Sequence, residues 1–188
     1  MRKCTVHLKS TAPYSQSRMH RIPKEEKETA DAHEERTWRE KCTVDSEGYI
    51  CIPAMAFKQG LSRAAKMLSM QIPGRGKATY SKHFEAGIII YKNVRLPVKK
   101  AEVERIAVNC NGNGIRGPGT RVLRFFPQVP SWEADVEVAI LDDTITPAVF
   151  QKHFEEAGLL VGVGQNRPEN GGSSGRFDCV DFKWEVIG

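Results

Sequence analysis

The sequence predicts an α+β fold in which two helices cover an antiparallel sheet. Two segments with apolar residues at helical spacing, 54–70 and 146–157, are separated by short runs of β-branched and apolar residues. One such run precedes the first helical segment, several lie between the two, and one follows the second. The chain has 188 residues, 40% of them hydrophobic, which suits one domain with its own core.

The first strand is followed by a long insertion. Residues 5–9 (TVHLK) alternate apolar and polar side chains, as a half-buried strand does. Residues 12–48 then lack any apolar period, and the part at 24–41 is dense in charges of both signs. That part is either a solvated helix or an extended insertion. Its only large apolar residue is Trp38, which we expect to anchor it to the core.

The first helix is predicted at 54–70. The apolar run 49–52 (YICI) leads to Pro53, which suits the first turn of a helix because its missing N–H costs little there. Basic residues fall off the apolar face, and the glycines and proline of 71–77 end the helix. The apolar face is formed by Phe57, Leu61, Ala64, Ala65 and Leu68.

The second half supplies the remaining strands and a second helix. Thr146 and Pro147 suit the cap and first position of that helix, and Gly158 suits its end. Residues 93–97 either continue the preceding strand or turn away from it. In the last strand we expect Val180, Phe182, Trp184 and Val186 to share one face. The predicted strands are 87–91 (GIIIY), 105–108 (RIAV), 122–126, 133–141 and 177–187.

Without its insertions the chain reads strand, helix, strand, strand, helix, strand. This is the βαββαβ plan of the ferredoxin-like fold, here as a single domain over residues 1–188. RNA-recognition modules use the same plan and bind RNA on the open face of the sheet. The aromatic-rich signature of those modules is missing from this sequence, which disfavours an ordinary RNA-recognition module.

Several classes of protein are disfavoured by missing motifs. The five cysteines (Cys4, Cys42, Cys51, Cys110 and Cys179) stand singly, which indicates free thiols in a reducing cytoplasm. No run approaches the length of a membrane span, and no histidine or cysteine spacing indicates a metal site. The GxGxxG match at 112–117 is followed by a strand-like segment rather than a helix, so we interpret it as accidental. We therefore expect a cytoplasmic protein without metal or cofactor.

Basic residues in glycine-rich loops carry the functional prediction. The formal charge is +5, and cations gather after the first strand and in the loops at 73–77, 109–121 and 162–176. Glycine lets main-chain amides approach a phosphate, and the arginine fork matches phosphate oxygens. Tyr14 and Tyr80 could stack on bases. The alternative is that these are solvated loops without a partner. The predicted contacts are Tyr14, Arg18, His20, Arg21, Lys24, Arg75, Lys77, Tyr80, Lys82, Arg116, Arg121, Arg167 and Arg176.

The segment GVGQNRPENGGSSGRF at 162–177 resembles the glycine-rich loop of the RAMP superfamily, the ferredoxin-like RNA-binding proteins of CRISPR effector complexes. The long insertion after the first strand is similar too. The resemblance implies binding of single-stranded RNA or DNA along its backbone, with side-by-side assembly of subunits. It covers the topology broadly and one loop specifically. The chain is also similar in character to compact phage-encoded proteins.

Three functions remain open from the sequence. The first is a non-enzymatic protein that binds single-stranded nucleic acid, RNA rather than DNA, with little sequence preference and no catalytic residue. The second is a metal-independent endoribonuclease that uses His20 or another loop histidine as general base. The third is a phage structural protein, or a factor that blocks a host complex through protein contacts. In that third case, the acidic strand face and the segment 24–41 would meet a protein partner or a second copy of the chain.

Overall fold

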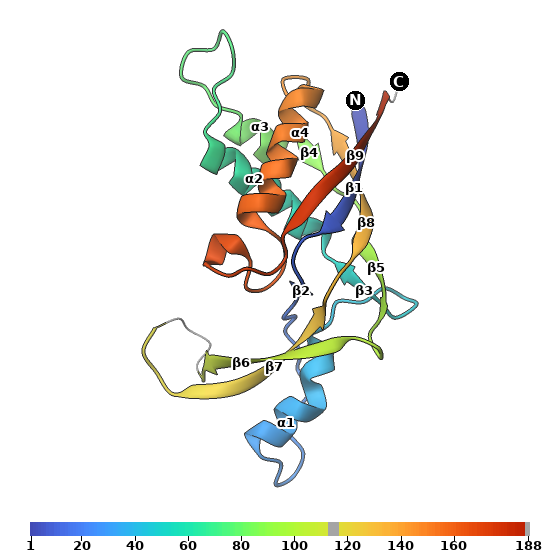
Figure 1. Ribbon diagram of the computed structural model, residues 1–188, viewed down its shortest axis with the longest axis vertical. Helices are drawn as coiled ribbons and strands as arrows, with labels where there is room; N and C mark the ends of the chain where they lie inside the picture. The colour runs from blue at the N-terminus through green and yellow to red at the C-terminus, as the bar shows by residue number, and fades with distance from the viewer. Residues whose placement is uncertain (113–116, 187–188) are drawn as a thin grey trace.

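The computed structural model describes residues 1–112 and 117–186 and has an α+β fold with antiparallel sheets, as the sequence predicts (Figure 1). The helices are α1 (Ala30–Thr37), α2 (Ala54–Leu68), α3 (Ser81–Ala86) and α4 (Pro147–Glu156). The strands are β1 (Arg2–Ser10), β2 (Tyr14–Ser15), β3 (Tyr49–Ile52), β4 (Ile88–Ile89), β5 (Val94–Lys99), β6 (Glu104–Asn111), β7 (Arg121–Val129), β8 (Glu133–Ile140) and β9 (Phe177–Val186).

The main sheet has the strand order β4-β8-β1-β9, with every neighbouring pair antiparallel. β1 lies inside it, and Val6 stands opposite Val136 on one side and Phe182 on the other. Because side chains alternate along a strand, Cys4, Val6 and Leu8 all point to the same face, where they are fully buried. That face carries the core.

Helices α2 and α4 cover the buried face of the sheet (Figure 1). Phe57 of α2 lies 6.4 Å from Phe154 of α4, measured between ring centroids. Phe150 of α4 meets Trp184 of β9 edge-on at 5.4 Å. Offset and edge-on contacts of this kind stabilise aromatic cores beyond the area they bury. The apolar stripes predicted from the sequence are therefore the contacts that join helix to helix and helix to sheet.

The opposite face of the sheet is solvated and ion-paired. Lys9 pairs with Glu133 at 3.0 Å, and Lys3 pairs with Glu137 at 3.2 Å. His7 Nδ1 lies 2.7 Å from an oxygen of Asp135. The strand predicted at 133–141 is thus confirmed, and its acidic side chains face outward.

A second sheet, in the order β2-β7-β6, combines β2 of the insertion after β1 with β6 and β7 from the second half of the chain, and α1 of the insertion packs against it. Trp38 is 4% exposed, which confirms it as an anchor. A second anchor is Lys41, which is 6% exposed. Its ammonium donates to the carbonyl oxygen of Phe125 at 2.7 Å and to the carboxylate of Glu34. The charged segment is held in place by one buried cation as well as by one aromatic ring.

Two predicted boundaries are wrong. The strand predicted at 87–91 keeps only the two residues of β4, and residues 94–99 form β5, which pairs with β3 in a separate two-stranded sheet. Gly158 does not end α4, because the chain continues through a π turn at Ala157–Val161 to Gly162, where φ is +69°. A side chain at Gly158 would overlap the carbonyl oxygen of Phe177, so this glycine allows close packing instead.

The last strand departs from the expected alternation. The pairing of β1 with β9 shifts register between His7 and Leu8. Phe182 and Trp184 pack against the core, whereas Val180 is 59% exposed and Val186 is 86% exposed. Val180 is the extra residue at this shift and is turned away from the core, which sequence periodicity does not reveal. Val186 keeps the alternation of Phe182 and Trp184 but is the last residue of β9, beyond the cover of the helices.

All five cysteines are free thiols, as expected from their spacing.

Within residues 1–112 and 117–186, no helix has the length and apolar character needed to cross a membrane.

Candidate nucleic-acid interface

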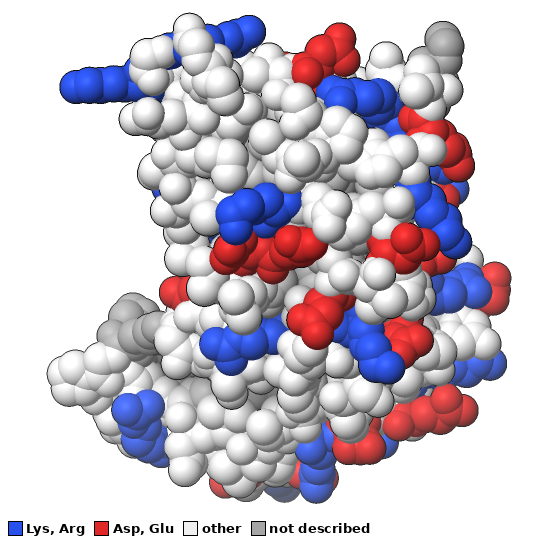
Figure 2. All heavy atoms as spheres, turned by 45° about the horizontal axis from the view of Figure 1, so that its top comes forward, with Lys and Arg blue, Asp and Glu red and all other residues white. Residues whose placement is uncertain are grey.

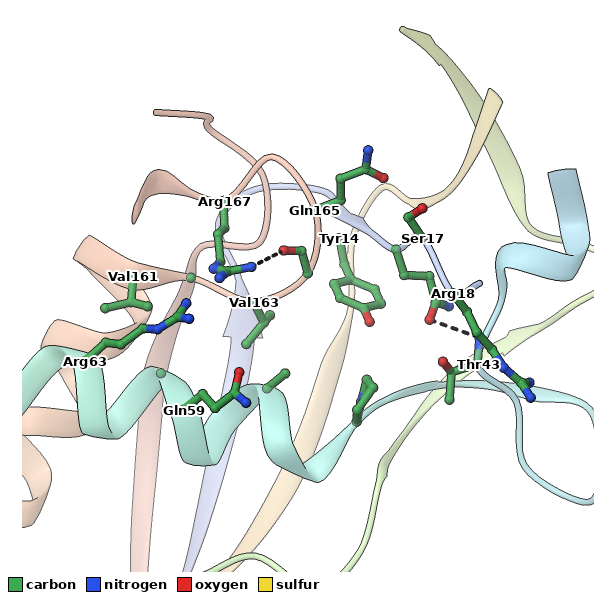
Figure 3. A pocket seen from close by; sticks show the side chains of 16 residues that line it. Tyr14, Ser17, Arg18, Thr43, Gln59, Arg63, Val161, Val163, Gln165 and Arg167 are labelled. Carbon is green, nitrogen blue, oxygen red and sulfur yellow. Dashed lines mark hydrogen bonds between the residues drawn. The ribbon is translucent and has the colours of Figure 1, made fainter. Parts of the chain in front are cut away.

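A groove of about 410 Å³ lies between α2, the segment 14–18 and the glycine-rich loop that follows α4 (Figure 3). We call it the α2 groove. Its lining residues are Tyr14, Gln16, Ser17, Arg18, Thr43, Pro53, Ala56, Gln59, Gly60, Arg63, Val161, Gly162, Val163, Gly164, Gln165 and Arg167.

One wall of the groove is a single side of α2. Pro53, Ala56, Gln59, Gly60 and Arg63 recur at three- and four-residue spacing, which brings them together on one helix surface. The opposite side of α2 packs into the core. The same amphipathic pattern that buries one side of α2 in the core therefore turns its polar side toward the groove. That side carries the amide of Gln59 and the guanidinium of Arg63.

The other wall is the loop 161–167, and its glycines are required by close packing. Gly164 has φ +82°, and a side chain there would overlap the carbonyl oxygen of Ser15. At Gly175 a side chain would overlap the carbonyl oxygen of Val163. Only glycine combines a positive φ with such an approach. The loop is thus a tightly packed wall. Glycine is required at Gly164 and Gly175 by this packing, rather than by the phosphate approach that we expected from the sequence.

Main-chain hydrogen bonds join this loop to the segment around β2. The amide of Gln165 donates to the carbonyl oxygen of Ser15 at 2.8 Å, and the amide of Gly175 donates to that of Pro13 at 2.7 Å. Within the loop, the amide of Val163 donates to the carbonyl oxygen of Gly175 at 2.9 Å. Two segments about 150 residues apart in sequence are thereby held together as one rim of the groove.

The groove is cationic. Three of its lining residues are arginines and none is acidic. Arg63 and Arg167 lie close together at one end, and Arg18 lies at the other end (Figure 3). The Nη1 of Arg167 donates to the carbonyl oxygen of Gly164 at 3.0 Å, and its Nε donates to Glu169 at 3.0 Å. Arg63 also pairs with Glu169, which lies outside the lining.

Neutral polar groups lie between the two cationic ends. The amide oxygen of Gln16 accepts from the main-chain N–H of Thr43 at 3.0 Å, which fixes its side chain. Gln59, Ser17 and Gln165 add further donors and acceptors to the lining. Such groups can form hydrogen bonds with sugar hydroxyls or base edges without adding charge.

Among the described residues of the three glycine-rich loops, only those of the loop at 162–176 line the α2 groove. In Figure 1 the loop between α2 and α3 projects at the top, the loop after α4 lies at mid-height, and strands β6 and β7 lie in the lower part of the molecule. Figure 2 shows basic and acidic side chains intermixed over the face that it draws, rather than one broad basic field. The helices and hairpin that the loops connect extend in different directions, which separates the loops in space.

Of the predicted contacts, the groove is lined by Tyr14, Arg18 and Arg167. Arg176 is half-buried, and its Nε donates to the carbonyl oxygen of Leu159 at 3.2 Å instead. Arg116 lies outside the described residues. The other predicted cations, Arg21, Lys24, Arg75, Lys77, Lys82 and Arg121, are exposed away from the groove lining.

The stacking role predicted for Tyr14 and Tyr80 is wrong. Tyr14 is 1% exposed and Tyr80 is 4% exposed, and both rings belong to the hydrophobic core. A base cannot lie on a ring whose faces are covered by other side chains. Burial also raises the pKa of the Tyr14 hydroxyl, which therefore stays protonated beside the groove.

None of the five histidines lines the α2 groove. His20 is half-buried, and its ring lies 6.2 Å from that of His33. His153 is fully buried, with Nδ1 2.6 Å from the carbonyl oxygen of Val149. Over the described part of the chain, no three histidine, cysteine or acidic side chains are grouped so that they could hold a metal ion.

Sequence reasoning missed most of the groove lining, including the two side chains of α2, Arg63 and Gln59. Both were on the polar side of the predicted helix, where charged and amide side chains are usually just solvated. Their four-residue spacing was visible in the sequence. What the sequence did not show is that the loop 161–167 covers this side of the helix, because the contact joins segments about 100 residues apart.

A scan against protein-family models and a search of curated proteins found no match to this chain.

Proposed function

We propose that this chain binds single-stranded nucleic acid in the α2 groove, with phosphates held by Arg18, Arg63 and Arg167. The observation that carries the proposal is the composition of the lining, which has three arginines, several neutral hydrogen-bonding side chains and no carboxylate. Guanidinium groups bind phosphate oxygens through paired hydrogen bonds. Contacts to the phosphate backbone position a strand without reading its sequence.

The extent of the groove favours a strand over a single small anion. It runs along α2 from Pro53 to Arg63, which corresponds to about 15 Å at the helical rise per residue. Cations lie toward both ends, with amides and hydroxyls between them. A chain of nucleotides offers the same alternation, because charged phosphates flank neutral sugars and bases.

We further propose that the core is ferredoxin-like. The proposal is supported by the chain order β1, α2, β4, β8, α4, β9 and by the antiparallel sheet order β4-β8-β1-β9, with both helices on one face. The resemblance to the RAMP superfamily rests on this order and on the loop 162–177, one part of which lines the groove. If the chain shares that family's role, the ligand is RNA, and several copies of the chain could assemble along it.

The test is a titration of labelled single-stranded RNA, single-stranded DNA and duplex DNA with the purified protein at 50 mM and 200 mM salt. We expect both single strands to bind, more weakly at the higher salt because released counterions drive the association. No binding to either single strand at 50 mM salt would end the proposal. Loss of full-length RNA during incubation in EDTA would replace it with the ribonuclease hypothesis.

A further inference from the structure

Two arginines from opposite walls of the α2 groove share one oxygen atom. The Oε2 of Glu169 accepts from Nε of Arg167 at 3.0 Å and also from Nη1 of Arg63. Arg63 belongs to α2, whereas Arg167 and Glu169 belong to the glycine-rich loop. The side chains are partly buried, at 39% exposure for Arg63 and 24% for each of the other two.

This arrangement brings two like charges within reach of one atom. Two guanidinium groups that both contact one carboxylate oxygen would repel each other if no anion lay between them. The repulsion is strongest where water is partly excluded. Glu169 supplies that anion. A carboxylate oxygen and a phosphate oxygen present the same kind of charged acceptor to an arginine fork. The position of Glu169 Oε2 is therefore one that a phosphate oxygen could take.

The arginines keep donors for a second acceptor. Each guanidinium has five N–H bonds in a planar fork. Arg167 uses Nε for Glu169 and Nη1 for the carbonyl oxygen of Gly164, which fixes the plane of its fork at the groove wall. In Figure 3 the guanidinium groups of Arg63 and Arg167 approach each other from opposite sides of the groove. An incoming phosphate would therefore find the fork of Arg167 already oriented.

We propose that Arg63 and Arg167 form a phosphate subsite whose resident counter-ion is Glu169, and that a bound phosphate group displaces this carboxylate. The inference rests on the proposed function for the nature of the full ligand, and it adds a way in which the site is regulated. Glu169 weakens binding by competing for the same donors, and it prevents repulsion between the arginines when no ligand is present. It lies in a short turn at Pro168–Asn170, outside the groove lining, so it can move aside without unfolding α2 or α4.

Glu169→Gln tests the competition because it keeps the shape of the side chain and removes its charge. We expect this variant to bind a labelled single-stranded RNA 12-mer at least about fivefold more tightly than the unaltered protein, the low end of coupling between groups in one site. The gain must shrink when Arg63→Gln is added and disappear when Arg63→Gln and Arg167→Gln are both added, since the carboxylate acts through these two arginines. Glu156→Gln is the matched control, because Glu156 pairs with Lys152 at 3.2 Å and does not line the groove.

A second measurement uses inorganic phosphate and needs no nucleic acid. We expect millimolar phosphate to raise the melting temperature of Glu169→Gln more than that of the unaltered protein, at constant ionic strength, because a ligand of the folded state stabilises it. Adding Arg63→Gln and Arg167→Gln together must abolish the difference, because both arginines bind the carboxylate. If phosphate stabilises Glu169→Gln but neither it nor the unaltered protein binds a single strand, the subsite stands and the proposed function fails. If RNA binds the unaltered protein but Glu169→Gln binds it equally or more weakly, Glu169 positions the arginines and the inference is overturned.

Discussion

Gly164 lies so close to the main-chain carbonyl of Ser15 that no side chain fits between them. This contact seats the glycine-rich loop on the segment after β1 and completes the groove wall that faces α2. The structure therefore explains the glycine at position 164 by close packing of the backbone, rather than by the close approach of a ligand. The loop must pack on itself and on β2 in a left-handed backbone conformation.

Gly164→Ala should lower the free energy of unfolding by about 2–3 kcal/mol, because it combines a strained φ with a backbone clash. Gly171→Ala is the control. Its φ of +76° is similar, but nothing lies within 4 Å of the added methyl group, so we expect a loss of only about 1 kcal/mol. Urea denaturation of both variants measures the difference. Equal losses would mean that the contact with Ser15 has no energetic consequence.

The buried pair Glu34 and Lys41 should be essential to the position of the insertion. Glu34→Ala leaves the ammonium of Lys41 buried without its carboxylate, and we expect a loss of about 3–5 kcal/mol in the free energy of unfolding. Adding Lys41→Met to that variant should recover much of the loss, because the unpaired charge is gone. A double-mutant cycle by urea denaturation measures the coupling. Additive losses would show that the pair is not coupled.

Burial lowers the pKa of His153 below its ordinary value of 6.5. Below about pH 6.5 the unfolded chain therefore binds a proton at this histidine more readily than the folded protein does. The contribution of His153 to the free energy of unfolding is thus fully present above that pH, and it is lost as the pH falls toward the lowered pKa of the folded protein. The slope contributed by one such group is at most about 1.4 kcal/mol per pH unit.

His153→Asn tests this because asparagine does not titrate. The variant should be less stable at every pH, since it lacks the ring that stacks on Phe84 at 4.2 Å. Its unfolding free energy should nevertheless fall less steeply between pH 6.5 and 5 than that of the unaltered protein. Parallel pH profiles would show that another group causes the acid sensitivity.

Thiol reactivity should separate Cys110 from the other cysteines. Burial raises the pKa of Cys4 to about 12 and that of Cys42 to about 11, and it raises the pKa of Cys51 and Cys179 as well. Since the thiolate is the reactive form, these four should react slowly with Ellman's reagent at pH 8. Cys110 is half-buried on β6 and should react first, leaving one fast phase that disappears in Cys110→Ser. Two or more fast thiols would contradict the burial of Cys4, Cys42, Cys51 or Cys179.

Local rules predicted the elements that depend on local chemistry. The start of α4 is one example, since the hydroxyl of Thr146 accepts from the amide of Val149 at 3.4 Å and Pro147 takes the first helical position. The buried stripes of α2 and α4 are another. α3 was missed because its sequence at Ser81–Ala86 continues a basic, glycine-rich stretch and is only six residues long.

Contacts between distant segments were not predictable in the same way. Arg63 was visible as a polar residue on a helix, but its partner Glu169 is 106 residues away. Arg75 and Arg167 occur in similar glycine-rich contexts, yet only Arg167 reaches the groove. Composition shows which residues can bind a phosphate, whereas tertiary packing decides which of them act together.

Binding of a labelled single-stranded RNA 12-mer to matched arginine variants tests the central claim most directly. We expect Arg18→Gln, Arg63→Gln and Arg167→Gln each to weaken binding, by about tenfold for removal of one charge-assisted hydrogen bond, and to make the salt dependence shallower by about 0.7 for each phosphate that is no longer neutralised. Arg75→Gln and Arg121→Gln, at exposed positions outside the groove lining, should change affinity by less than about twofold, as expected for surface positions outside an interface. If the loop variants weaken binding as much as the groove variants, or the groove variants bind like the unaltered protein, the strand does not lie in the α2 groove.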